Sequence, residues 1–152
     1  MPKLDVNSLE IRLLKPGDVP EMIRIDSHYS GRRRDDYYQE KMNRHLDTRY
    51  QLTLSFAACM NNRLVGFLMG EVSRGTYGLP EDVAAVDTIG IDPDHQKSGI
   101  AEELMNEFVS HARSLGVKKI YTLVNWEEVG LFHYFHRMGF QPGLVLYLEK
   151  NV

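Results

Sequence analysis

The chain has 152 residues, of which 43% are hydrophobic and 26% charged, and this predicts a single globular domain over residues 1–152. Its net charge is −3 and its pI is near 6.1, which argues against a nucleic-acid-binding surface. Cys59 is the one cysteine, which excludes an intrachain disulfide and a cysteine-based zinc site. The sequence shows neither an apolar leader nor a membrane-spanning run, and this predicts a cytoplasmic protein without membrane contact.

The first half of the chain predicts a strand, two helices and a hairpin. Alternating apolar and polar residues are typical of strands, and apolar residues at helical spacing follow the turn at 15–18. Asn61-Asn62-Arg63 is a hairpin signal between two apolar segments. The expected elements are a strand at 9–14, a helix from Val19, a loop entering a second helix over 30–47, and strands at 50–60 and 64–72.

The second half predicts alternating strands and helices. An apolar strand ends at Asp92-Pro93, and Gly116 ends the helix that begins after Gly99. The expected elements are strands at 83–91, 118–125 and 143–150, a helix with the apolar stripe Ile100, Leu104, Phe108, Ala112 and Leu115, and a helix at 127–138. The order β-α-α-β-β-β-α-β-α-β indicates an α/β or α+β fold with a mixed, mostly antiparallel sheet flanked by helices.

A short motif lies between the 83–91 strand and the following helix. Residues 96–101, Gln-Lys-Ser-Gly-Ile-Ala, have the pattern Q/R-x-x-G-x-G/A. Gly99 and Ala101 let the backbone approach a ligand, and the N–H groups at a helix start favour an anion, to which Lys97 adds a positive charge. The Walker A and Rossmann patterns are absent. Taken alone, the motif is also compatible with a plain strand-to-helix turn.

Three stretches together resemble the Gcn5-related N-acetyltransferase (GNAT) family over nearly the whole chain. They are "VDTIGIDPDHQKSGIAEELM" (86–105), "FHYFHRMGF" (132–140) and "IRLLKPGDVPEMIRID" (11–26). The resemblance implies a sheet with splayed central strands, and transfer of an acyl group, acetyl before others, from CoA to a primary amine by direct attack. It implies acetyl-CoA as co-substrate and no metal. The amine acceptor, a small molecule or a protein, stays open, as does a homodimer.

The resemblance also implies which residues contact the cofactor. The backbone beside Gly90 would pair with the pantetheine arm as an added strand does. The loop amides would hold the pyrophosphate, an asparagine would follow the next strand, and an aromatic residue would line the groove. The implied cofactor-binding residues are Ile89, Gly90, Ile91, Gln96, Lys97, Ser98, Gly99, Ile100, Ala101, Asn125 and Phe132.

Two residues are candidates for catalysis. Asp87 is a carboxylate inside an apolar strand, where an unpaired charge is costly, and the resemblance implies that it takes the proton of the amine. The alternative is a carboxylate that faces solvent or holds an arginine. Phe135 stands where the family often has a tyrosine acid, which leaves Tyr134 as the candidate, with its side chain about 100° around the helix.

Other features have a functional and a structural interpretation. The segment "GRRRDDYY" (31–38) is either a solvated, self-paired face or a site where arginines bind an acceptor carboxylate. His133 and His136 are one helical turn apart but have no evident third metal ligand. Two rival functions remain: a catalytically weak or inactive CoA-binding GNAT-like regulatory domain, and a nucleotide-binding protein that uses the same anion loop.

Overall fold

The computed structural model describes residues 8–46, 52–74 and 82–152. The chain divides into two compact units, Met1–Thr122 and Leu123–Val152, which are described separately. The first unit contains the sheet and three α-helices, and the second contains one helix, α4 (Val129–Arg137). Among the described residues, no helix combines the length and the apolar character needed to cross a membrane.

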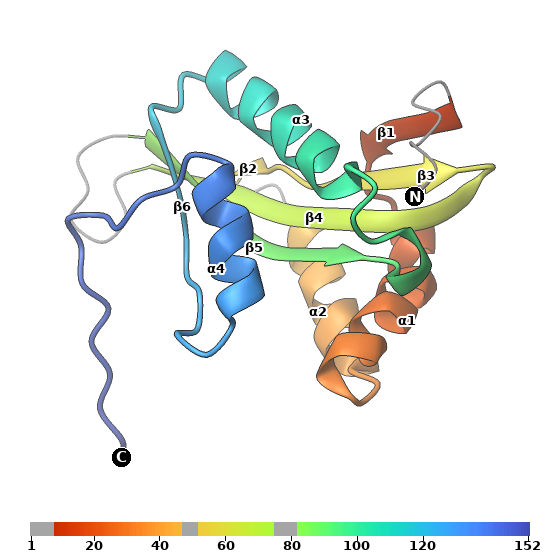
Figure 1. Ribbon diagram of the computed structural model, residues 1–152, viewed down its shortest axis with the longest axis horizontal. Helices are drawn as coiled ribbons and strands as arrows, with labels where there is room; N and C mark the ends of the chain where they lie inside the picture. The colour runs from red at the N-terminus through yellow and green to blue at the C-terminus, as the bar shows by residue number, and fades with distance from the viewer. Residues whose placement is uncertain (1–7, 47–51, 75–81) are drawn as a thin grey trace. The chain divides into compact units, whose positions relative to one another are not determined.

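The sheet of the first unit is mixed and mostly antiparallel (Figure 1), as the sequence predicts. Its strand order is β1-β3-β4-β5-β6, with β2 beside β4, and only the β5–β6 pair is parallel. The strands are β1 (Leu9–Leu13), β2 (Leu52–Thr53), β3 (Phe56–Met60), β4 (Arg63–Arg74), β5 (Asp82–Ile91) and β6 (Lys119–Thr122).

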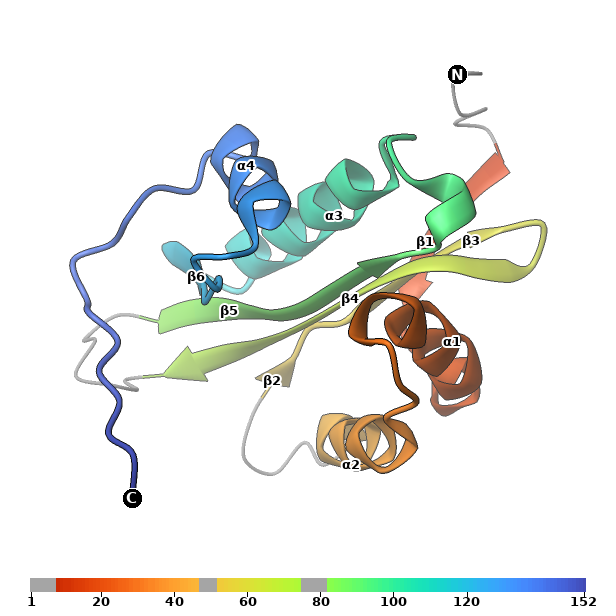
Figure 2. The ribbon, with the colours of Figure 1, turned by 60° about the horizontal axis from the view of Figure 1, so that its bottom comes forward.

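Helices cover both faces of this sheet (Figure 2). The pair α1 (Val19–Ser30) and α2 (Asp35–Leu46) lies on one face, and α3 (Ile100–Ser114) lies on the other. Two short 3-10 turns, η2 (Pro16–Asp18) and η4 (Pro93–His95), precede α1 and α3. The apolar stripe of α3 is buried as predicted over Ile100, Leu104, Phe108 and Ala112, whereas Leu115, at the end of the helix, is exposed.

The core on the α1–α2 face is built from large side chains. Met22 and Ile25 of α1 and Tyr38 of α2 have no exposed surface, and the Tyr38 ring meets the edge of Phe67 of β4 at 6.1 Å between centroids. Full burial of one such side chain stabilises the folded state by about 1.5–3 kcal/mol. Packing against the sheet therefore fixes α1 and α2, and with them every side chain that they direct toward β5.

The β3–β4 hairpin forms where the sequence predicts it. Asn61 and Asn62 have φ angles of 51° and 60°, the left-handed conformation that both central residues of a two-residue hairpin turn require. Asparagine tolerates this region better than other residues with a Cβ atom. The turn sets the register between β3 and β4, in which Met60 lies opposite Arg63.

The strand expected at 50–60 is wrong as a single element; its first two residues lie outside the described part. β2 and β3 are separate strands that both pair with β4, and Leu54 and Ser55 between them belong to neither, although the Leu54 amide still donates to the Gly70 carbonyl at 2.9 Å. The Ser55 hydroxyl accepts a hydrogen bond from the Gly70 amide at 3.2 Å, so a side chain replaces a backbone partner at that point.

The strand expected at 143–150 is also wrong. Residues 141–152 form no strand, and the side chains of Leu144, Leu146 and Leu148 are 101%, 79% and 81% exposed. An apolar run favours a strand only where a neighbouring backbone supplies hydrogen bonds, and among the described residues no strand pairs with this segment. The order of elements therefore ends with α4.

Candidate functional site

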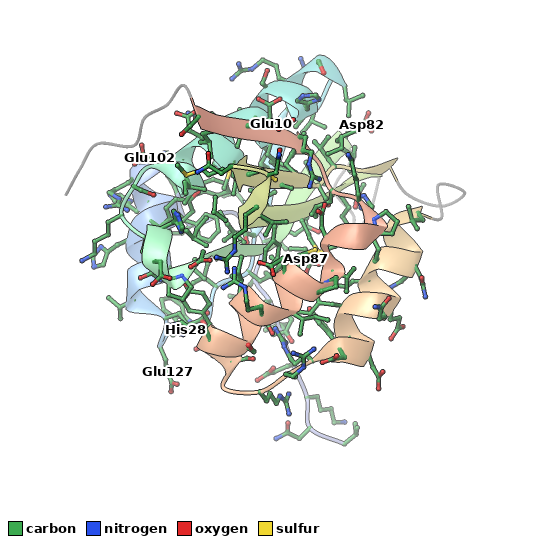
Figure 3. The ribbon with its side chains drawn as sticks, turned by 90° about the vertical axis from the view of Figure 1, so that its right-hand side faces the viewer. Glu10, His28, Asp82, Asp87, Glu102 and Glu127 are labelled. Atoms are coloured by element: carbon green, nitrogen blue, oxygen red, sulfur yellow. The ribbon has the colours of Figure 1, made fainter. Side chains whose placement is uncertain are left out.

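Asp87 occupies a β-bulge in β5. Met69 lies opposite Thr88 and Gly70 lies opposite Val86, so Asp87 is the extra residue of the strand. Bulges redirect a side chain locally and are common beside active sites. Asp87, labelled in Figure 3, is directed to the α1–α2 face, where its Oδ2 forms an ion pair with Lys41 Nζ of α2. The Asp87 side chain stays 47% exposed, so this carboxylate is paired but accessible.

The register of β4 and β5 determines where the backbone groups of β5 point. The amide of Asp92 donates to the carbonyl of Val65 at 2.8 Å, one residue beyond the Gly66–Ile91 pair on each strand. This makes Gly66–Ile91 a non-hydrogen-bonded pair of the antiparallel ladder. Ile89, two residues earlier and opposite Leu68, has the same orientation. The N–H and C=O groups of Ile89 and Ile91 therefore point away from β4.

The edge of β5 to which these groups point is open. The parallel pairing with β6 covers only Val83–Val86, opposite Lys119–Thr122. From Asp87 to Ile91, no strand among the described residues pairs with this edge. The strands β5 and β6 thus separate at the bulge, as expected for splayed central strands. An extended molecule with amide groups can bond to such an edge in the manner of an added strand.

One contact at this edge was not anticipated from the sequence. The Tyr29 hydroxyl of α1 donates to the carbonyl of Ile91 at 2.6 Å and accepts a hydrogen bond from the side chain of Gln96. Tyr29 thereby links α1, β5 and the loop. Nothing in the sequence signals this role, because Tyr29 and Ile91 are 62 positions apart.

The loop after β5 has the backbone conformation that its glycine permits. Gly99 has a φ angle of 89° and is the N-cap of α3, and Lys97 has a φ of 57°. A Cβ atom built on Gly99 would meet nothing within 4 Å. Glycine is therefore required here by the left-handed conformation, and the space in front of it is open. The motif residues 96–99 thus lead directly into the first turn of α3.

Asp92 anchors the start of this loop. Its Oδ1 accepts from the amide of Asp94 at 3.0 Å, and its Oδ2 accepts from Arg24 at 2.7 Å. Burial would raise the pKa of Asp92, but the hydrogen bonds from Arg24 and the Asp94 amide outweigh it and hold the pKa below its usual value. The carboxylate therefore stays charged at neutral pH and holds α1 to the beginning of the loop.

Two of the three consecutive arginines have partners within the molecule. Arg34 binds Asp26 of α1, with Nε at 2.8 Å from Oδ2, and Arg33 binds Asp35 at 3.0 Å in an exposed pair. Within the described part of the chain, the guanidinium of Arg32 has no ion pair. Arg33 and Arg34 are therefore paired with carboxylates of the same chain, as the self-paired interpretation of this segment predicts.

The second unit contains three of the predicted site residues. The Oδ1 of Asn125 accepts from the Glu127 amide at 3.0 Å and shapes the turn before α4. Phe132 is 46% exposed on α4. Tyr134 is buried, and its ring contacts the edge of Phe135 at 5.1 Å between centroids.

The described residues contain no cluster of three or more His, Cys, Asp or Glu side chains that could hold a metal ion. His133 and His136 are both exposed on α4. Cys59 is buried, and burial raises the pKa of its thiol. A thiol in that state is a core side chain rather than a nucleophile.

Two curated proteins are similar to part of the chain. An uncharacterized N-acetyltransferase of Methanocaldococcus jannaschii is 27% identical over 86 residues, which are 57% of this chain and 38% of that protein. A mycothiol acetyltransferase of Geodermatophilus obscurus is 31% identical over 85 residues, which are 56% of this chain and 28% of that protein. The matched regions thus span less than half the length of either relative.

Solved structures share the fold over nearly the whole chain. The aminoglycoside N-acetyltransferase AAC(6')-Iy in complex with CoA has a TM-score of 0.77 at 15% identity, with 95% of each chain covered. A ribosomal-protein-alanine N-acetyltransferase from Brucella melitensis has a TM-score of 0.72 at 21% identity, with 94% of this chain and 99% of that chain covered. At these identities the likeness establishes the fold.

A family profile described as "Acetyltransferase (GNAT) family" matches residues 19–140. The match begins at α1, includes the bulge at Asp87 and the loop before α3, and continues through α4. It thus contains each segment that the site is built from. The chain belongs to the acetyltransferase (GNAT) family.

Proposed function

We propose that this protein transfers an acetyl group from acetyl-CoA to a primary amine by direct attack. The observation that carries the proposal is the open edge of β5, which begins at the bulge of Asp87 and leads into the glycine loop of α3. Along one continuous stretch lie an accessible carboxylate, backbone edge groups that pair with no strand among the described residues, and a helix start that favours an anion. Family membership supports this use of the stretch.

In this proposal the cofactor lies along β5 and the loop. The pantetheine amides form hydrogen bonds with the backbone of Ile89 and Ile91, with Gly90 between them. If pantetheine bonds to the Ile91 carbonyl, the Tyr29 hydroxyl must first release that carbonyl. The pyrophosphate lies at residues 96–101, where Lys97 adds its charge. An anion at a helix N-terminus gains about 0.3–1 kcal/mol at an exposed site. Asn125 and Phe132, which belong to the second unit, stay cofactor-binding predictions that rest on the family resemblance.

The proposed chemistry removes two protons from the protonated amine and supplies one to the departing thiolate. An amine with an ordinary pKa near 10.4 is protonated at neutral pH, so it must lose a proton before attack. Asp87 takes that proton, and the freed lone pair of the nitrogen attacks the thioester carbon. The nitrogen of the resulting tetrahedral intermediate then loses its second proton to solvent. The C–S bond then breaks, and the thiolate, a fair leaving group with a thiol pKa near 8.5, receives a proton from Tyr134 or solvent.

A thiol-release assay with acetyl-CoA and a broad amine library tests this function. We expect Asp87→Asn to lower kcat/KM about 10²-fold, in line with the loss of a general base, and Tyr134→Phe to cost about tenfold or less. Asp82→Asn makes the same chemical change at the start of β5 and is the matched control. A loss of about 10³-fold in Tyr134→Phe, beside a nearly silent Asp87→Asn, would contradict these roles.

A catalytically weak CoA-binding domain is the second candidate function. Phe135, at the position where the family often has a tyrosine, favours it, because phenylalanine cannot donate a proton. One protein with a similar fold, from Bacillus halodurans, is named a transcriptional regulator (TM-score 0.76, 17% identity). Tight binding of acetyl-CoA with no thiol release across the amine library would favour this second function.

A further inference from the structure

The ion pair between Lys41 and Asp87 bears on the choice of acceptor. Lys41 lies in the middle of α2 and its side chain is only 10% exposed, whereas that of Asp87 is 47% exposed. The Lys41 Nζ also lies 5.0 Å from the centre of the Tyr37 ring. A mostly buried ammonium therefore lies directly against the carboxylate that is proposed to take the proton of the amine.

The charges around this pair are balanced without an acceptor. The Asp26 carboxylate already neutralises Arg34. Two positive charges of α2 at this site, Arg44 and Lys41, are matched by the negative charges of Glu71 and Asp87 on the sheet. Burial lowers the pKa of Lys41, and the positive charge of Arg44 adds to that effect. An acceptor that brings only positive charge would approach this ammonium against repulsion. An acceptor that brings a negative charge as well would keep the balance.

We infer that Lys41 selects acceptors that carry a carboxylate close to the reacting amine. The inference rests on the proposed function. The substrate class is then amino acids and related aminocarboxylates, rather than polyamines or other polycations. The Nζ of Lys41 contacts Oδ2 of Asp87, so Oδ1 stays available for the amine, and an ammonium has three N–H donors with which to hold a carboxylate as well.

The consecutive arginines are weaker candidates for this role. Arg33 and Arg34 hold Asp35 and Asp26, and using either for an acceptor would break an existing ion pair. Arg32 has no ion pair within the described residues but lies in the exposed turn before α2. Lys41, by contrast, touches Asp87 itself, so one acceptor with its amine and carboxylate on the same carbon can reach both residues.

The test compares matched acceptors in the thiol-release assay with acetyl-CoA. Each amino acid of a panel is measured beside its own amide, which lacks the negative charge, and spermidine represents the polycations. Rates are expressed per unprotonated amine, because the amide group lowers the pKa of its neighbouring amine. We expect kcat/KM for the best amino acid to exceed that of its amide at least tenfold.

Variants of Lys41 test whether this residue causes the preference for an amino acid over its amide. Lys41→Met should raise the KM of the amino acid at least tenfold and change that of the amide less than threefold, whereas Lys41→Arg should keep the preference. Lys118→Met, which removes a positive charge from the exposed turn before β6, is the matched control and should change neither. The wild-type ratio of acid to amide is informative even if Lys41→Met does not fold.

Four results would overturn the inference. Amides or spermidine that react better than amino acids with the wild-type protein would refute the substrate class and leave acetyl transfer standing. A preference that survives Lys41→Met, or that disappears in Arg32→Ala instead, would refute the role of Lys41. Failure of every amine to release thiol would refute the proposed function, and the inference with it.

Discussion

At the scale of single residues, Gly99 is the position where backbone conformation and ligand binding meet. Its φ of 89° disfavours any side chain, while the space beside it is empty. A substitution there adds strain of roughly 1–2 kcal/mol, because a side chain in the left-handed region crowds the following carbonyl. A negatively charged side chain would in addition repel the proposed pyrophosphate.

We expect Gly99→Asp to abolish measurable acetyl-CoA binding in a fluorescence or calorimetric titration. Gly116→Asp is the matched control: Gly116 has a φ of 84°, has nothing within 4 Å of its Cβ position, and lies past the other end of α3. Gly116→Asp should lose a similar amount of folding stability and keep its affinity for acetyl-CoA. If Gly99→Asp folds and binds acetyl-CoA like the wild type, the loop does not hold the phosphates.

The residues of the site differ in how well the sequence predicts them. Asp87 and the loop residues are adjacent in the chain, so one strand-loop-helix pattern identifies them together. Lys41 and Tyr29 contact β5 across 46 and 62 positions, through helices whose rotation is fixed only by packing in the core. Local periodicity predicts that those helices exist but not which of their polar side chains reaches the bulge.

At the scale of elements, β4 and β5 depend on glycines that let helices and neighbouring backbone approach closely. A Cβ atom on Gly70 would lie 2.7 Å from the carbonyl oxygen of Ala85 on β5 and would also collide with the Phe108 ring of α3. A backbone oxygen cannot move aside as a flexible side chain can. Next to the bulge, β5 and α3 therefore leave room only for a hydrogen atom at Gly70, and only glycine fits this position.

We expect Gly70→Ala to lower the free energy of unfolding by about 1–3 kcal/mol, the cost of overpacking a dense core. Urea denaturation measures it, with Gly17→Ala as control, since a Cβ atom on Gly17 meets nothing within 4 Å. Equal stability of Gly70→Ala and the wild type would show that β4, β5 and α3 are less tightly packed than described.

The two wrong strand predictions have a common physical cause. Apolar alternation at 50–60 and the apolar run at 143–150 are compatible with a strand, but a strand exists only through pairing with another backbone. Ser55 interrupts the first through a hydrogen bond of its side chain, and the second pairs with no other strand. Neither outcome is encoded in the local pattern.

At the scale of the whole molecule, the sequence predicts the family, the mixed sheet and the order of elements up to α4, except that the one strand expected at 50–60 is divided into β2 and β3. The family profile covers residues 19–140, which include part of each compact unit. What sequence patterns do not predict is the bulge register, which makes Asp87 the extra residue of β5 and opens the strand edge beyond it. That register depends on pairing across three strands.

The central claim is that acetyl-CoA binds along the open edge of β5 and the loop before α3. The most direct measurement is an NMR titration of ¹⁵N-labelled protein with acetyl-CoA, and in parallel with ATP. We expect acetyl-CoA to shift the backbone amide signals of Ile89, Ile91 and Gly99, and ATP to leave those of Ile89 and Ile91 unchanged. Unmoved signals of all three residues at saturating acetyl-CoA, or equal shifts with ATP, would contradict the account.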